Sequence, residues 1–173
     1  MLRGGRLRGE KGGDLRQLSN ESLIARIFET VPYPTFLVDQ EVHVLHANTA
    51  AARLLAPADP HGGTAPRRLG DLLRCDRATR SPGGCGSSRD CDACPIRGAV
   101  RRALRGEIVR RNLAFVAREE NGRKREICFL VSAAAIDHER RKLAVVTLED
   151  VTEIFHLRSK TPHCSACGRT LNP

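Results

Sequence analysis

Four cysteines lie between positions 75 and 94, and no other side chains in the sequence are as well suited to bind a metal. Cys75, Cys85, Cys91 and Cys94 are separated by nine, five and two residues. Thiolates two residues apart can bind one ion from a single tight turn, and a loop rich in Gly, Pro and Ser can bring two more to complete a tetrahedral set. The spacing therefore predicts one metal centre held by all four thiolates.

Disulfides and a redox dithiol are the alternatives for these cysteines. The basic, Gly-rich residues 1–18 lack the apolar run of a secretory signal, and the chain has no stretch of about 18 apolar residues that would span a membrane. We therefore expect a cytoplasmic protein with no membrane span, in which disulfides are disfavoured. The βαβ context of a thioredoxin-like dithiol is absent, so we expect no enzyme.

Zinc and an iron–sulfur cluster both fit a four-cysteine set. A closed zinc site contributes folding energy without redox chemistry, whereas an iron–sulfur cluster makes a domain sensitive to oxygen or redox state. Pro95 follows Cys94 as in ferredoxin-type ligand runs, but proline is equally suited to the first position of a helix. The identity of the metal stays open, with a slight preference for zinc.

A second cysteine pair lies near the end of the sequence. Cys164 and Cys167, followed by Gly168, have the form of one zinc knuckle, which supplies two ligands. The pair is thus a candidate second half-site. His163, cysteines elsewhere in the chain, the tail of a second copy or cysteines of a partner would complete it, and a free dithiol is the remaining alternative.

The elements that must position these cysteines follow from apolar periodicity, prolines and turn signals. Asn121 and Gly122 form the strongest hairpin signal, between two long strands. Helices are predicted near 20–31, 50–55, 68–74 and 95–105, and strands at 35–39, 42–47, 110–118, 125–133 and 142–149. This order predicts an α+β domain with a five-stranded antiparallel sheet and its helices on one face.

The chain accordingly divides into three parts. Residues 1–18 are a basic flexible tail, residues 19–158 are one folded domain that contains the cysteine loop 75–94, and residues 159–173 are the CxxC tail. The segment 153–160 is predicted to be a short helix that continues from the last strand.

Several motifs resemble those of PAS sensory domains across residues 22–158. They are Val31-Pro32-Tyr33-Pro34 leading to Val38-Asp39, then Asn48 before a short helix, and Asp150-Val151-Thr152 at the end of the last strand. The resemblance implies a structural role for Asn48 and signal transmission through Asp150, Val151 and Thr152.

The cysteine loop is also similar to an insertion found in one bacterial PAS sub-type. Gly84-Cys85-Gly86 and Cys91-x-x-Cys94, with Cys75 upstream, match its GCG…CxxC pattern. This similarity implies a metal or iron–sulfur centre near the ligand-facing side of the domain.

Two classes of function follow. One is a PAS-type sensory or regulatory protein that responds to redox state, oxygen or a small ligand and signals in trans to a partner carrying the output function. The other is a zinc-stabilised adaptor that binds protein or nucleic acid through its basic surface and CxxC tail. The net charge of +9 suits nucleic acid, but aromatic residues are only 3% and the basic residues are spread out, so nucleic acid is not favoured.

A homodimer is also expected, through the first helix and the outer face of the sheet. Both parities of the last strand are apolar, with Leu143 and Val145 on one and Ala144, Val146 and Leu148 on the other. A solvated outer face would be polar. We expect Val146 to lie on this outer, dimer-forming face.

Overall fold

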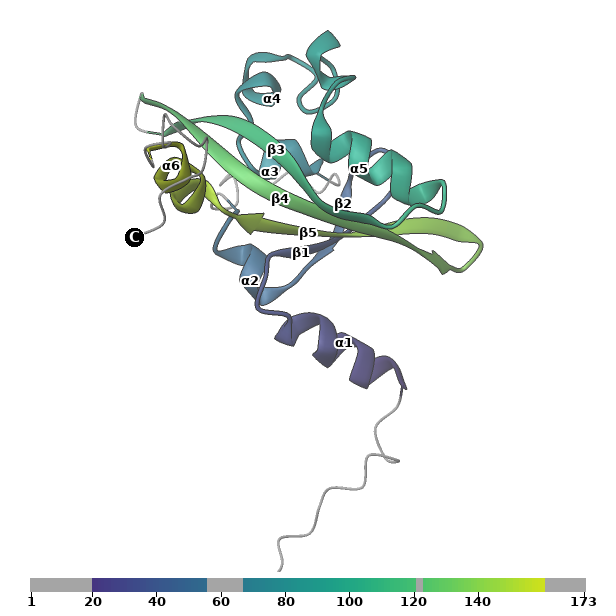
Figure 1. The fold of residues 1–173 in the computed structure, drawn as a ribbon. Coiled ribbons are helices and arrows are strands. Elements are labelled where there is room, and N and C mark those ends of the chain that lie inside the picture. The colour runs from purple at the N-terminus through teal and green to yellow at the C-terminus, as the bar shows by residue number, and fades with distance from the viewer. Residues whose placement is uncertain (1–19, 56–66, 121–122, 161–173) are drawn as a thin grey trace, which may run out of the picture.

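A five-stranded antiparallel sheet organises the fold (Figure 1), and the computed structural model describes residues 20–55, 67–120 and 123–160. The sheet order is β2-β1-β5-β4-β3. The strands are β1 (Thr35–Val38), β2 (Val44–Ala47), β3 (Val109–Glu120), β4 (Arg123–His138) and β5 (Arg141–Asp150). The α+β class and the five-stranded sheet predicted from the sequence are confirmed.

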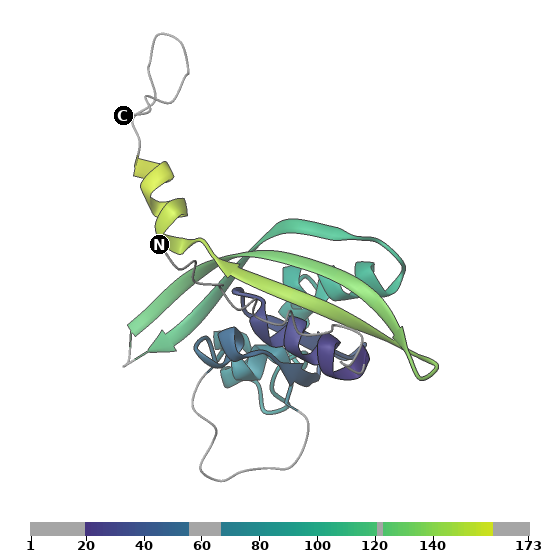
Figure 2. The same cartoon turned by 90° about the horizontal axis from the view of Figure 1, so that it is seen from below.

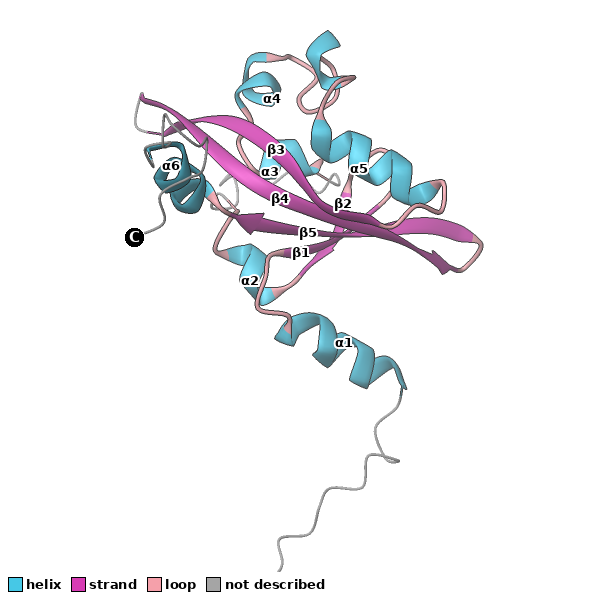
Figure 3. Cartoon of the chain, in the orientation of Figure 1, coloured by secondary structure: helices cyan, strands magenta, loops and turns pink. Residues whose placement is uncertain are grey.

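Most of the described helices are shorter than predicted, and the short helix α4 was not predicted. They are α1 (Asn20–Thr30), α2 (Thr49–Ala52), α3 (Leu69–Leu72), α4 (Asp76–Arg80), α5 (Pro95–Leu104) and α6 (Thr152–Lys160), with a 3-10 turn η2 at Arg89–Cys91. Figure 3 shows α4 and the turn within the segment expected to be an irregular loop. Helix α5 begins at Pro95, as predicted, because proline lacks an N–H that the first helical position does not need.

The long hairpin of β3 and β4 also follows the prediction. Its strands pair up to Glu120 and Arg123, which leaves Asn121 and Gly122 as the connection. Those two residues lie outside the described part of the chain, as do residues 1–19 and 161–173, which include the predicted CxxC tail. Among the helices that are described, none is both long and apolar enough to cross a membrane.

The core lies between one face of the sheet and the helices α3 and α5. Its largest fully buried apolar side chains are Phe36, Val38, Val42, Leu69, Leu73, Val100, Phe129, Val131, Val146 and Leu148. Burying such a side chain contributes roughly 1.5–3 kcal/mol. Helix α5 packs across β3, β4 and β5, so the segment that follows the cysteines is fixed to the three long strands.

The expectation that Val146 lies on the outer face is wrong. Val146 pairs with Phe36 and Ala133 and is 0% exposed in the core. Because side chains alternate along a strand, Val145 is the residue that points outward. The outer face is nonetheless apolar, since it also carries the exposed side chains of Leu113, Phe115 and Ile136. This is why the sequence did not distinguish the two faces.

Candidate metal centre

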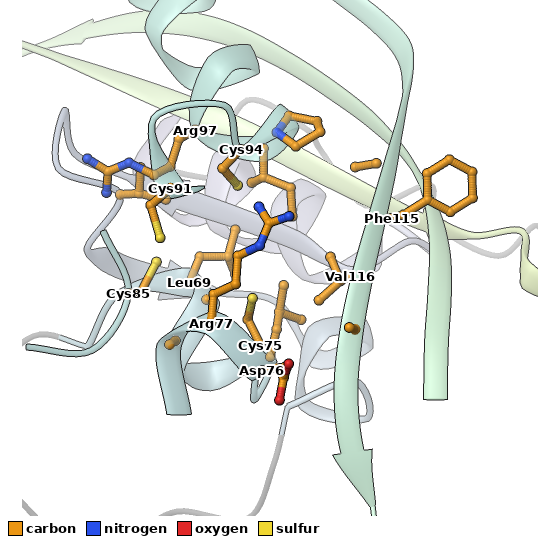
Figure 4. A pocket seen from close by; sticks show the side chains of 18 of the residues that line it. Leu69, Cys75, Asp76, Arg77, Cys85, Cys91, Cys94, Arg97, Phe115 and Val116 are labelled. Carbon is orange, nitrogen blue, oxygen red and sulfur yellow. The ribbon is translucent and has the colours of Figure 1, made fainter. Parts of the chain in front are cut away.

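The four clustered cysteines line one cavity of about 310 Å³ between α3, α4, the start of α5 and strand β3. Cys85 and Cys91 are buried and Cys75 and Cys94 are half-buried, and all four are free thiols. In Figure 4 the sulfurs of Cys85 and Cys91 point toward one another, and those of Cys75 and Cys94 point into the same space. The structure thus brings the predicted set together in one place.

Each cysteine comes from a different local element. Cys75 precedes α4, and its backbone forms an isolated antiparallel β-bridge with Arg118 of β3. Cys91 ends the 3-10 turn, and its carbonyl accepts the N–H of Cys94 at 3.2 Å. Cys94 is the N-cap of α5.

Cys85 is held by its backbone from both sides. Its N–H donates to the Asp71 carboxylate at 2.7 Å, and its carbonyl accepts from Arg68 Nη1 at 3.0 Å. The flanking glycines have positive φ, 69° at Gly84 and 91° at Gly86. These conformations strain any residue with a Cβ, which explains the Gly-Cys-Gly pattern.

The glycines also allow close approach. A Cβ on Gly84 would lie 2.8 Å from Asp71 Oδ1, and one on Gly86 would lie 2.6 Å from Arg97 Nη1. The Gly-Cys-Gly motif was recognisable in the sequence, but the contacts that Asp71, Arg68 and Arg97 make with it were not. The motif was the available signal, because paired glycines around a cysteine indicate that other groups approach the backbone there.

Burial raises the pKa of the Cys85 thiol above its ordinary value, and the charges of Asp71 and Cys94 act in the same direction. A hydrogen bond from the backbone of Gly70 and the charge of Arg97 oppose this rise. Because thiols bind metals as thiolates, loading this site must release the proton of Cys85.

The four thiols share a cavity without forming a finished single-ion site. Within the described ranges, no three Cys, His, Asp or Glu side chains converge closely enough to hold a metal ion. A bound centre would therefore require the cysteine segment to draw inward. Such coupling of binding to local folding is common for cysteine sites.

Gly70 lies beside the side chains of Cys85 and Cys75. Its substitution therefore tests directly how the two cysteines pack. A Cβ there would lie 2.5 Å from Cys85 Sγ and 3.8 Å from Cys75 Cβ. We expect Gly70→Ala to displace Cys85 and to lower the free energy of unfolding by about 1–3 kcal/mol in urea titrations. The control is Gly98→Ala in α5, where a Cβ would meet nothing within 4 Å. That variant should be more stable by about 0.5–1 kcal/mol, and equal effects at both glycines would contradict the packing described.

Asn48, for which the resemblance implies a structural role, is buried and hydrogen-bonded through both atoms of its side-chain amide. Its side-chain oxygen accepts the N–H groups of Ala51 at 2.9 Å and Thr35 at 3.0 Å, so it caps α2 and fixes the start of β1. Its amide nitrogen donates to the carbonyls of Val31 and Tyr33, at 3.0 Å each. One buried side chain thereby joins the end of α1, β1 and α2.

Asp150, Val151 and Thr152 join β5 to α6. The Thr152 hydroxyl donates to Asp150 Oδ1 at 2.6 Å and accepts the N–H of Cys128 at 2.9 Å. The Val151 N–H donates to the Cys128 carbonyl at 2.9 Å. Figure 2 shows α6 leaving the end of β5 at this junction. The start of α6 is thus bonded to strand β4, while Cys164 and Cys167 lie outside the described residues.

Part of the chain matches a known domain family. A family model described as a PAS domain matches residues 22–85. That range contains Cys75 and Cys85 and ends before Cys91 and Cys94. A comparison with curated proteins found no match.

Among solved structures, the chain is similar to an RNA-binding light-oxygen-voltage receptor, with a TM-score of 0.50 and 16% identity over 90% of this chain. It spans only 41% of that receptor's length. It is also similar to a domain of a sensory box sensor histidine kinase/response regulator from Geobacter sulfurreducens, with a TM-score of 0.40, 17% identity and coverage of 75% of this chain and 93% of that one. A third is the PAS domain of nitrogen regulation protein NR(II) from Vibrio parahaemolyticus, with a TM-score of 0.38, 14% identity and coverage of 75% and 98%.

The family match and the sheet with its packed helices support a PAS-type domain. PAS domains as a class are sensory and regulatory, and this coarse role is the one that the match supports for the chain.

Proposed function

We propose that this protein is a PAS-type sensor in which Cys75, Cys85, Cys91 and Cys94 bind one metal or iron–sulfur centre that responds to redox state, oxygen or a small ligand. The supporting observation is that four free thiols from separate elements line a single cavity beside α5. Four thiolates suit zinc and iron–sulfur clusters, whereas hard cations prefer oxygen ligands. When bound, such a centre supplies either a rigid structural link or a redox-dependent charge.

The proposed signal passes from the cavity to strand β3. Ala114 and Val116 line the cavity from this strand. Phe115 lies between them in sequence, and Figure 4 shows its ring turned away from the cysteines. That ring contacts Phe155 of α6, with ring centroids 5.2 Å apart. Movement of the cysteine segment against β3 would therefore reach α6 through one strand.

The output would lie on a partner, and a second copy is the proposed intermediary. Helix α1 exposes Leu23, Ile24 and Ile27, and the outer sheet face exposes Leu113 and Phe115. Together with the exposed apolar side chains of α6, these surfaces would lose water contact in a homodimer. Pairing through these surfaces would bury both copies of α6 in one interface, so a movement of one helix would be felt by the other.

Replacing Cys91 tests the proposed centre. Because Cys91 is buried in the cavity wall, we expect Cys91→Ser to lose bound metal and to become more sensitive to proteolysis between residues 76 and 94. Metal content and limited proteolysis of the full chain measure both effects. Cys128→Ala is the matched control, since Cys128 is equally buried but lies in β4 and not among the cavity-lining residues. Full metal content in Cys91→Ser, or a disulfide among these four cysteines in protein made in a reducing cytosol, would overturn the proposal.

A further inference from the structure

Arg97 is a buried cation with an unmet hydrogen-bonding group. It lies in the first turn of α5, is only 9% exposed and lines the same cavity as the cysteines. Its Nη1 has no hydrogen-bond partner in the described part of the chain. Its Nη2 forms a long ion pair with the exposed carboxylate of Glu41, 3.7 Å from Oε2, so the group left without a partner is the Nη1 donor. A buried donor without an acceptor is costly, which indicates a missing acceptor beside Nη1.

Of the described carboxylates beside the cavity, none accepts a hydrogen bond from Nη1, and Glu126, which lines the cavity, is exposed on β4. The Asp71 carboxylate accepts the Cys85 N–H, and Asp76 is paired with Arg80 at 2.8 Å. Arg77, the other cation in the lining, already donates to the carbonyl of Asp90 at 3.1 Å. Of the two arginines that line the cavity, Arg97 is therefore the one whose buried Nη1 donor lacks an acceptor.

The proposed centre would supply a negatively charged acceptor. Four thiolates around a divalent zinc ion carry a net charge of about −2, and the same holds around a [4Fe–4S] core of charge 2+. Arg97 Nη1 lies beside Gly86, the residue that follows Cys85. A Cβ added to Gly86 would be 2.6 Å from this nitrogen. Hydrogen bonds from such neighbours commonly tune thiolate centres.

We propose that Arg97 is the counter-cation of the four-cysteine centre and positions it by donating from Nη1 to the thiolate of Cys85. This inference rests on the proposed function. It adds a residue that the cysteine spacing does not reveal, and it assigns the first turn of α5 a role in binding as well as in packing.

The test compares Arg97→Met, Arg97→Lys and the control Arg101→Met in the full chain. Arg101 is one turn further along α5, and its side chain is 43% exposed. The measurements are Zn²⁺ affinity by chelator competition and the thermal midpoint of the metal-free protein. We expect Arg97→Met to weaken Zn²⁺ binding by about 10–100-fold and Arg97→Lys to retain most of the affinity. The metal-free midpoint of Arg97→Met should stay equal or rise, because a buried donor without an acceptor has been removed and the ion pair lost with it is long and half exposed to water.

The outcomes separate this inference from the proposal beneath it. Equal Zn²⁺ affinity of the unmodified chain and Arg97→Met would overturn the role of Arg97 and leave the four-cysteine centre standing. A fall in both affinity and metal-free midpoint would show that Arg97 acts only in folding, and would also overturn the inference. An unmodified chain that binds neither Zn²⁺ nor a reconstituted iron–sulfur cluster would overturn the proposed function and this inference with it.

Discussion

Asn48→Asp is expected to lower the free energy of unfolding by about 3–5 kcal/mol. Asn48 is 1% exposed, and its amide nitrogen faces the carbonyl oxygens of Phe28, Val31 and Tyr33. The aspartate carboxylate retains the acceptor for Thr35 and Ala51 but replaces the donor with a negative oxygen. That oxygen would face three backbone acceptors in a buried site. The loss should therefore release α1 as well as α2.

Urea titration followed by far-ultraviolet circular dichroism measures this loss. Thr49→Ala is the neighbouring control, because the Thr49 hydroxyl donates to Glu29 at 2.7 Å on the exposed surface. Hydrogen bonds at exposed positions contribute little, so this control should cost no more than about 1 kcal/mol. Similar losses at positions 48 and 49 would contradict the structural role of Asn48.

Val146→Asp should prevent folding, whereas Val145→Asp should not. Val146 is fully buried between β1 and β4, where an unpaired carboxylate costs about 4 kcal/mol or more. Such a cost is comparable to the whole stability of many domains. Val145 points to the outer face and is half-buried, so its carboxylate would remain in contact with water.

The same pair tests the proposed homodimer. Circular dichroism should show native secondary structure for Val145→Asp and its loss for Val146→Asp. Sedimentation of the unmodified chain at tens of micromolar should show a dimer, and Val145→Asp should shift it toward monomer because a charge enters the proposed interface. A folded Val146→Asp protein would contradict the strand register. A monomeric unmodified chain would remove the dimer from the proposal.

The fold was predictable where one local signal decides the outcome. Pro95 specified the start of α5, and Asn121-Gly122 placed the hairpin between β3 and β4. Which side chains of β5 face the core could not be predicted in this way. Val145 and Val146 are chemically alike, and only the helices that cover one side of the sheet determine which is buried.

The candidate site was also predictable only in part. Spacing alone was enough to propose the four cysteines as one ligand set, since metal ligands recur at characteristic intervals, and the structure places all four around one cavity. The groups that hold them are distant in sequence, because Asp71 and Arg68 contact Cys85 across 14 and 17 residues. Arg97 was missed because it is one of many arginines, and its burial becomes evident only in three dimensions.

The central claim is that the clustered thiols form one centre, and elemental analysis of the full chain tests it most directly. The protein is purified anaerobically from a reducing cytosol, with zinc, iron and acid-labile sulfide counted per chain. A variant with Cys75, Cys85, Cys91 and Cys94 all replaced by Ser, which retains Cys164 and Cys167, is purified in parallel. We predict that the unmodified chain holds about one zinc ion or one iron–sulfur cluster more than this variant. Equal metal and sulfide in the two proteins would contradict the account.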